Sequence, residues 1–373
     1  MKIKIVIISQ PAVAGVKRHV IDVLNNIDLQ RYDVTYVYSP LRADESYNDE
    51  LKSLKEKKIK CIPVTMFRDI HFLQDLKAFI KILFIIKKIR PAIVHTHSAK
   101  AGFLGRIAAK LVSFRIKTIY TPNAMPIHLS RKYFYLEKIA SYFSDIVIAV
   151  SNSEYEEILK WKVVTERKLV TIPLSIREHY KEYKRDEKQN SKFIVTSCGE
   201  IRYQKNPLFF FNVAANILEL FPEEFEFIWI GDFYNDEESY SAKKLINENF
   251  SAKRIKITGW LPNPDMFIAK SDLFCMFSRY ESFGYVTVDA MMQDVPVIAT
   301  NSPGTRDLVK HLLTGYIVQN DIKSAVEGIL YLKQMEKVRA DISKNAKNMV
   351  SEKYSIDNMM KSLGKLYESA VLK

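Results

Sequence analysis

Two carboxylates eight residues apart, Glu281 and Asp289, lie in the stretch SRYESFGYVTVDA at residues 278–290. Eight residues of helix rise about 12 Å, and less where part of the span is loop. Between the two acids, Gly284 lets the backbone approach a ligand closely, and the free amides of a helix start can face an anion. This arrangement suits a nucleotide sugar, which offers hydroxyls, a diphosphate and a ribose. The alternative interpretation is a capped helix with one exposed acid and one acid at the edge of the core.

Two cations follow a predicted buried strand in the segment GEIRYQKNP at residues 199–207. Arg202 and Lys205 are three residues apart, and a helix is predicted to begin near Pro207. A guanidinium and an ammonium beside a helix start make a suitable diphosphate site, although two solvated loop cations would have the same sequence. The segment NSPGTRD at residues 301–307 offers further amides to an anion before another predicted helix.

Motifs of several other enzyme classes are absent from the sequence. It contains no G-x-x-x-x-G-K, G-x-G-x-x-G, G-x-S-x-G or D-x-D, which argues against a P-loop protein, a dinucleotide enzyme, a serine hydrolase and a metal-bridged diphosphate. His95 and His97 share one face of a predicted strand, but no third ligand is evident nearby, so we predict no metal site. The three cysteines are far apart and favour a reducing, cytoplasmic setting.

Alternating strand and helix patterns must position these loops. The alternation begins with a β-rich run at residues 2–9, continues for about 175 residues, and restarts after a densely charged segment. We therefore predict an α/β protein with two doubly wound, Rossmann-like domains that face each other across a cleft. The predicted parts are an acceptor-binding domain (1–180), a linker (181–192), a nucleotide-sugar-binding domain (193–355) and a C-terminal helix (356–373) that packs back toward the first domain.

The excess positive charge lies in the first half of the chain. Residues 1–180 contain 30 Lys and Arg against 17 Asp and Glu, whereas the remainder contains 26 of each. Residues 74–90 form a basic apolar helix with Lys77, Lys81 and Lys88 on one face, which suits either a crossover helix on the sheet or contact with an anionic membrane surface. No nucleic-acid recognition module is evident, and no apolar run is long enough for a transmembrane helix.

The sequence resembles the retaining nucleotide-sugar glycosyltransferases of family 4, the glycosyl transferases group 1 with the GT-B architecture. The resemblance covers nearly the whole chain and rests on AGVKRHV, IVHTHSAKAGFLGR, TIYTPNA, GEIRYQKNP and, above all, SRYESFGYVTVDA. It implies front-face transfer of a sugar without an enzyme nucleophile, so that catalysis consists mainly of positioning and charge stabilisation. It also implies that neither a metal nor another cofactor is needed.

The resemblance assigns roles to individual residues. Glu281 would bind hydroxyls of the donor sugar, and Asp289 would hold the ribose diol. Arg202 and Lys205 would neutralise the departing diphosphate, and with Glu281 they are the predicted catalytic residues. The further predicted donor contacts are Gly15, Asn123, Phe283, Gly284, Tyr285 and Val286, and the predicted acceptor contacts are His97 and Lys100.

Three positions depart from the family pattern. The family commonly has Glu where this chain has Asp289, and often has Arg where this chain has Glu200. It also often shows Thr-Pro-His where this chain has Asn123 in third place, and the histidine contacts the donor sugar in relatives. These departures leave the choice of donor sugar open.

The predicted function is a retaining hexosyltransferase that acts at the cytoplasmic face of a membrane as a peripheral protein. It would move a sugar from a nucleotide-diphosphate donor, expected to be a UDP-sugar, to a lipid-linked or polysaccharide acceptor in cell-surface glycan synthesis. One alternative is an enzyme like the UDP-N-acetylglucosamine 2-epimerases, although their pattern of acids and histidines is not seen. The other is a non-catalytic nucleotide-sugar-binding protein, against which the intact Glu281 and Lys205 argue.

Overall fold

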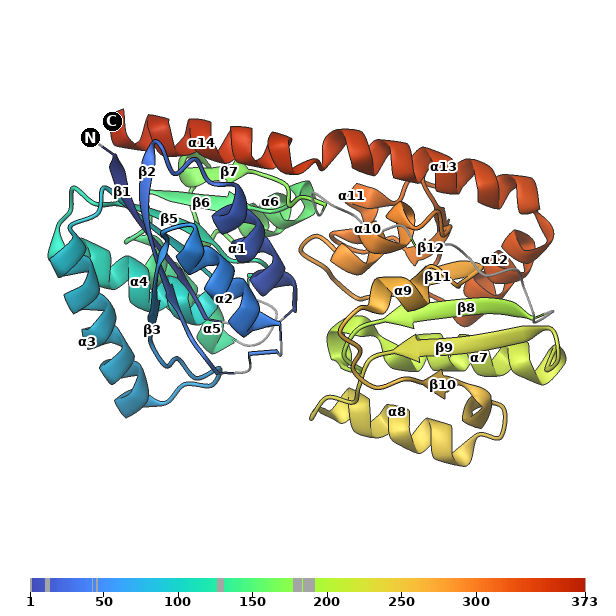
Figure 1. The fold of residues 1–373 in the computed structure, drawn as a ribbon. Helices are drawn as coiled ribbons and strands as arrows, with labels where there is room; N and C mark the ends of the chain where they lie inside the picture. Colours follow the sequence, from blue (N-terminus) through green and yellow to red (C-terminus); the bar gives the residue numbers. More distant parts are fainter. Residues whose placement is uncertain are drawn as a thin grey trace. The chain divides into compact units, whose positions relative to one another are not determined.

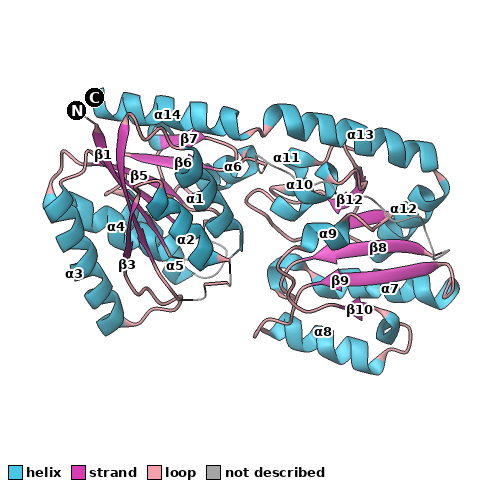
Figure 2. Ribbon diagram, in the orientation of Figure 1, coloured by secondary structure: helices cyan, strands magenta, loops and turns pink. Residues whose placement is uncertain are grey.

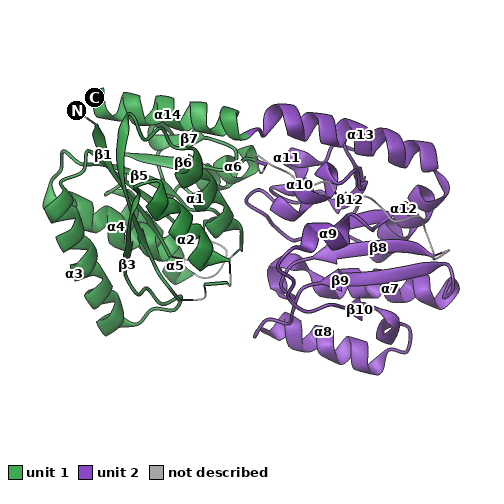
Figure 3. Cartoon of the chain, viewed as in Figure 1, with its two compact units in different colours: residues 1–175, 356–373 green, residues 176–355 purple. Residues whose placement is uncertain are grey.

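The computed structural model describes residues 2–10, 14–41, 43–44, 46–125, 131–176, 183 and 192–372. The chain forms two compact units, Met1–Ser175 with Ile356–Lys373 and Ile176–Ser355 (Figure 3). The C-terminal helix is thus part of the N-terminal unit. Apart from Tyr183 and Lys192, the predicted linker lies outside the described residues.

The N-terminal unit is built on a parallel sheet of seven strands in the order β3-β2-β1-β4-β5-β6-β7 (Figure 1). The strand order reverses between β1 and β4, and in such folds ligands bind beside the carboxyl ends of the strands at this point. The strands are β1 (Ile3–Ser9), β2 (Tyr32–Tyr38), β3 (Lys60–Pro63), β4 (Ile93–His97), β5 (Lys117–Thr121), β6 (Ile146–Ala149) and β7 (Leu169–Thr171).

Helices cover both faces of this sheet (Figure 2). The side chains of β1 alternate between the two cores that lie beneath them. Ile5 and Ile7 pack in a cluster with residues of α1, α2 and α14, whereas Val6 and Ile8 pack with residues of α3 and α4. This explains why the strand is a continuous apolar run. The helices are α1 (Ala14–Asn26), α2 (Tyr47–Glu56), α3 (Phe72–Ile89), α4 (Ala99–Val112), α5 (Arg131–Ser141), α6 (Asn152–Lys160) and α14 (Ile356–Leu372).

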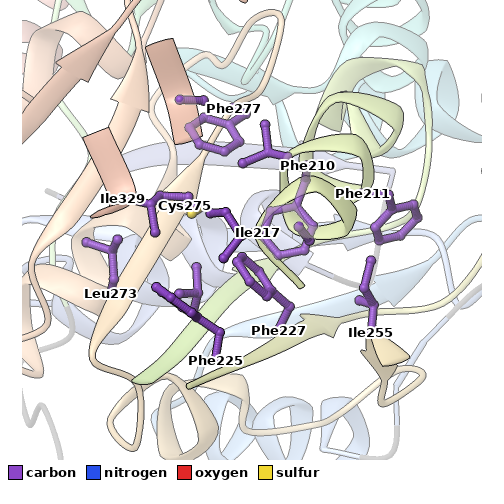
Figure 4. Packing of buried hydrophobic residues seen from close by; sticks show 14 of the residues in the cluster. Phe210, Phe211, Ile217, Phe225, Phe227, Ile255, Leu273, Cys275, Phe277 and Ile329 are labelled. Carbon is purple, nitrogen blue, oxygen red and sulfur yellow. The ribbon is translucent and has the colours of Figure 1, made fainter. Parts of the chain in front are cut away.

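The C-terminal unit has a second parallel sheet, of six strands in the order β10-β9-β8-β11-β12-β13. Aromatic and aliphatic side chains from the strands and from α7 fill its main core, among them Phe210, Phe225 and Phe227 (Figure 4). The strands are β8 (Phe193–Cys198), β9 (Phe225–Ile230), β10 (Lys256–Ile257), β11 (Leu273–Met276), β12 (Val297–Thr300) and β13 (Tyr316–Val318). The helices are α7 (Pro207–Leu220), α8 (Glu237–Glu248), α9 (Pro264–Ile268), α10 (Tyr285–Met292), α11 (Thr305–Leu308), α12 (Ile322–Gln334) and α13 (Glu336–Lys353).

The predicted fold of two doubly wound, Rossmann-like domains is confirmed, with differences at the sheet edges. The edge strand β10 consists only of Lys256–Ile257, which pair with β9 alone. The strands β7 and β13, of three residues each, were not predicted. Such short edge strands depend on the neighbouring strand for their conformation, and they are too brief to show a period in the sequence.

Candidate active site

Three loops meet at the carboxyl ends of β8, β11 and β12, which are neighbours in the C-terminal sheet. Lys205, from the first loop, donates a hydrogen bond to Oε1 of Glu281, from the second, at 2.7 Å. Gln204 Nε2 donates to the Tyr280 carbonyl oxygen at 3.2 Å and to Glu281 Oε2 at 3.4 Å. The backbone amide of Glu281 donates to the carbonyl oxygen of Pro303, in the third loop, at 2.9 Å. The sheet therefore brings together the predicted cation and the predicted acid from positions 76 residues apart.

The Lys205–Glu281 ion pair is largely shielded from solvent, since the two side chains are 16% and 8% exposed. Gly199 allows this placement, because the stem of Lys205 crosses directly over it. A Cβ at position 199 would lie 2.6 Å from Lys205 Cε, and the backbone there has a φ of +144°, which side chains disfavour. Each partner has replaced water by the other, so removing one leaves an uncompensated charge.

Gly304 likewise allows a close approach, here to the backbone of Glu281. Its φ is +79°, and a Cβ at this position would lie only 2.2 Å from the Glu281 carbonyl oxygen. The third loop can therefore lie against the backbone of Glu281 only because residue 304 has no side chain.

The helix α10 begins immediately after Gly284, which has a φ of +88°. The first backbone amides of this eight-residue helix, including those of Tyr285 and Val286, have no partner within it and can face an anion. Phe283 is buried, with its ring centroid 5.2 Å from that of Tyr354. Asp289, further along α10, is 6% exposed. The capped-helix alternative expected one exposed acid, and the structure has none at either position.

Arg202 has different interaction partners from Lys205. Its Nη1 donates to Glu200 Oε2 at 3.0 Å, and its guanidinium lies 5.2 Å from the centroid of the Tyr234 ring. Glu200 stands where a cation was expected, and it pairs with the nearest cation instead. Both cations are thus paired with a carboxylate, Arg202 with Glu200 of its own loop and Lys205 with Glu281 of the neighbouring loop.

The predicted residues of the N-terminal unit lie at the carboxyl ends of the adjacent strands β1, β4 and β5. Gly15 is in the first turn of α1, and Asn123 follows β5 with a φ of +53°. His97 is buried at the end of β4, and its Nε2 has no hydrogen-bond partner among the described residues. Lys100 pairs with Asp75 at 2.6 Å and donates to the Asp69 carbonyl oxygen at 2.8 Å, so its charge is already engaged. Acceptor binding by His97 and Lys100 stays a prediction.

Several residues that shape these sites were not singled out from the sequence. Gln204 and Gly199 were quoted in the loop motif without a role, and His19 was quoted only within AGVKRHV. A cavity of about 310 Å³ at the carboxyl ends of β1, β2 and β3 was also missed. It is lined by Gln10, Leu41, Met66, Phe67, Arg68, Asp69 and His71. The parallel topology was the available signal, since it places the ends of all three strands at one edge.

Neither a metal cluster nor a membrane span is found in the described parts of the chain. Within them, no group of three or more His, Cys, Asp and Glu side chains could hold a metal ion. No described helix combines the length and the apolar character that a membrane span requires.

Comparison with known proteins identifies the family. Residues 180–349 match the model described as glycosyl transferases group 1, and residues 13–178 match that of glycosyltransferase family 4. An Escherichia coli protein named UDP-Gal:alpha-D-GlcNAc-diphosphoundecaprenol alpha-1,3-galactosyltransferase is 27% identical and covers 100% of this chain and 98% of its own. The Staphylococcus aureus capsular polysaccharide biosynthesis glycosyltransferase CapM is 26% identical over 94% of this chain and 96% of its own.

A solved structure of another protein has a similar fold. Anabaena HepE in complex with UDP and glucose superposes with a TM-score of 0.83 and covers 98% of this chain and 100% of its own. At 18% identity, this likeness shows the fold alone. Together with the family models, which match nearly the whole chain in two consecutive parts, it leads to one conclusion: the chain belongs to the family 4, group 1 glycosyltransferases with the two-domain GT-B fold.

Proposed function

We propose that this glycosyltransferase moves a sugar from a UDP-sugar to a lipid-linked acceptor in the synthesis of a cell-surface polysaccharide. The transfer retains the anomeric configuration, needs no metal ion and takes place at the cytoplasmic face of a membrane. The observation that carries the proposal is the shielded Lys205–Glu281 pair beside the open start of α10. The names of the E. coli and S. aureus relatives support the choice of donor and of pathway.

The arrangement supplies the two functions that such a transfer requires. Glu281 accepts hydrogen bonds from hydroxyls of the donor sugar, while Lys205 carries the positive charge that the departing diphosphate needs. The free amides at the start of α10 add partial positive charge, and Asp289 binds the ribose. Without a donor, Lys205 and Glu281 satisfy one another, so the site is stable before the substrate arrives.

A transfer assay tests the proposal. The full-length protein is incubated with GlcNAc-diphosphoundecaprenol and with UDP-galactose, UDP-glucose, UDP-N-acetylglucosamine or GDP-mannose, with and without EDTA. We expect one UDP-sugar to give a product with an α linkage by NMR, at a rate that EDTA does not change. We also expect UDP-sugars to raise the melting temperature, because they bind the native state.

Other outcomes of this assay identify the alternatives. Conversion of UDP-N-acetylglucosamine to its 2-epimer without an acceptor would indicate an epimerase. A raised melting temperature without turnover of any donor, on this or on other glycan acceptors, would indicate a binding protein. A β-linked product would contradict retention, and loss of activity in EDTA would contradict metal independence.

We further propose that α3 contacts an anionic membrane. Ala78, Ile82 and Ile86 of this helix are buried, in a cluster with residues of the sheet and of α4. The opposite side exposes apolar residues that include Leu76, Ile80 and Phe84, with exposures of 44%, 44% and 61%. The exposed lysines Lys77, Lys81 and Lys88 lie on the neighbouring face of the helix. An apolar row flanked by lysines matches the acyl boundary and the headgroups of an anionic bilayer.

Vesicle binding tests this surface of α3. Each lysine near an anionic bilayer contributes about 1 kcal/mol, so changing Lys77, Lys81 and Lys88 to Gln is expected to weaken binding to vesicles containing phosphatidylglycerol by about a hundredfold. The measurement is sedimentation with vesicles at low and at physiological salt. Phe250→Ser in the C-terminal unit, where the side chain is 82% exposed, is the control and should bind as the wild type does. Equal binding of the triple variant and the wild type would rule out α3 as the membrane surface.

A further inference from the structure

His19, His97 and Asn123 form a polar cluster inside the N-terminal unit. They come from α1, the end of β4 and the loop after β5, at the edge of the sheet where its order reverses. His19 Nδ1 lies 2.8 Å from Asn123 Oδ1, and the rings of His19 and His97 are 5.0 Å apart between centroids. Both histidines are buried. The cluster joins residues up to 104 positions apart and lies where ligands of this fold bind.

The orientation of the Asn123 amide follows from its surroundings. Its Nδ2 donates to the Thr121 carbonyl oxygen at 3.3 Å. A carbonyl oxygen only accepts hydrogen bonds, so reversing the amide would place two oxygens against each other. The Oδ1 atom must therefore face His19, and the proton of that hydrogen bond must belong to His19 Nδ1.

The charge state of His19 completes this assignment. Burial lowers the pKa of His19 to about 4, even though the hydrogen bond to Asn123 acts in the opposite direction. The ring is therefore neutral near pH 7. A neutral imidazole protonated at Nδ1 carries a lone pair at Nε2, and no described residue forms a hydrogen bond with that atom.

His97 presents the complementary group. Its Nδ1 lies 3.5 Å from Asn123 Nδ2, so this nitrogen accepts and the ring proton is on Nε2. The Nε2 atom is buried and has no hydrogen-bond partner among the described residues. An unpaired buried donor is unfavourable, and a ligand that accepts its hydrogen bond removes this penalty.

The neighbouring His95, in contrast, has a hydrogen-bond partner for each of its ring nitrogens. Its Nδ1 lies 2.7 Å from the Tyr367 hydroxyl, and its Nε2 lies 2.8 Å from the Thr121 hydroxyl. Both nitrogens of His95 are thus used within the protein, whereas His19 and His97 each keep one for something else.

We propose that His19 Nε2 accepts a hydrogen bond from a sugar hydroxyl, and that Asn123 is the positioning residue that fixes the tautomer of His19. A lone pair on one ring and an N–H on the next match hydroxyls, which both donate and accept, and do not match a phosphate. This inference rests on the proposed function and names a sugar contact within it. It gives Asn123 a role different from the direct donor contact that the family resemblance implied.

Two variants of His19 test the proposal. His19→Phe keeps a planar ring of similar size but removes both nitrogens, whereas His19→Gln retains a polar side chain that can accept a hydrogen bond. We expect His19→Phe to lower kcat/KM about tenfold, as the loss of one hydrogen bond to substrate requires, and His19→Gln to recover part of it. His95→Gln is the control for a purely structural histidine, and its effect should be on the melting temperature rather than on KM.

Deoxy analogues identify the contacted hydroxyl and its source. Calorimetry measures the binding of UDP-sugars that each lack one hydroxyl, and the transfer assay measures KM for correspondingly deoxygenated acceptors. For the wild type, we expect one analogue to have about tenfold lower affinity, or a roughly tenfold higher KM, than the complete sugar. For His19→Phe, the same analogue and the complete sugar should differ very little, whether the analogue derives from the donor or from the acceptor. Equal losses in both proteins for every analogue would overturn the inference.

The two proposals fail in distinguishable ways. Absence of transfer by the wild type with every donor would contradict the proposed function, while the calorimetric comparison would still report on His19. Normal transfer by the wild type together with unchanged kinetics and binding in His19→Phe would contradict the inference alone.

Discussion

Replacing Lys205 by Met is expected to lower kcat for sugar transfer at least about tenfold and up to about a hundredfold. A charged hydrogen bond contributes about 1.5–3 kcal/mol, and this one is directed at the charge that develops on the diphosphate. Met keeps the length of the stem that crosses Gly199, so the loop retains its packing. The measurement is single-turnover transfer at saturating donor.

Matched variants separate catalysis from stability. Removing one member of a shielded pair leaves the other charge uncompensated, so Lys205→Met is also expected to lower the free energy of unfolding. Adding Glu281→Gln should restore part of that stability without restoring turnover. Lys256→Met removes a lysine that pairs with Glu226 at 2.6 Å but is 65% exposed, and it should leave both quantities nearly unchanged. Turnover of a folded Lys205→Met protein at the wild-type rate would refute the site.

The second large effect is expected from Gly304→Ala. The new Cβ would approach the Glu281 carbonyl oxygen to 2.2 Å, and a backbone atom cannot move aside as a flexible side chain can. The clash and the unfavourable φ together are expected to reduce the free energy of unfolding by about 2 kcal/mol or more. Displacement of Glu281 should also reduce kcat/KM about tenfold or more, because small shifts in positioning are costly.

Gly259→Ala is the control for Gly304→Ala. Gly259 has a similar φ of +73°, but a Cβ there would have no atom within 4 Å. Gly259→Ala should therefore lower the free energy of unfolding by only about 1 kcal/mol, the cost of the unfavourable φ, and should keep full activity. If the two variants behave alike in chemical denaturation and in transfer, close packing of residue 304 on Glu281 is not what positions the acid.

Much of the fold could be predicted from the sequence, because its strands are fully covered. Runs such as residues 2–9 and 207–220 have a length and an apolar content that few other structures accommodate, and they correspond to β1 and α7. The edge strands could not be predicted, since Tyr316–Val318 forms a strand only beside β12. The C-terminal helix was predicted to pack back toward the first domain, but the contacts that it makes there, such as that of Tyr367 with His95, were not.

The candidate site, like the fold, could be predicted only in part from the sequence. Local spacing was enough to suggest an acid, a helix start and a cation pair, because each of these lies within one loop. Pairing of Lys205 with Glu281, and of Arg202 with Glu200, depends on side-chain placement that spacing does not specify. Burial of Asp289 and His97 was equally beyond reach, since a strand or helix pattern gives a face but not what covers it.

SRYESFGYVTVDA, together with GEIRYQKNP and the alternation of strands and helices, indicated the class of chemistry, since residue types and short spacing dictate which groups a ligand can meet. Only the tertiary structure decided how those groups are held. Gly199 is required because the stem of Lys205 crosses it, and Gly304 because the backbone of Glu281, from another loop, lies against it. The tautomer of His19 is set by an amide 104 residues away, and its neutral state is set by burial. Distances between loops, and the charge states they impose, exist only once the sheets have brought the loops together.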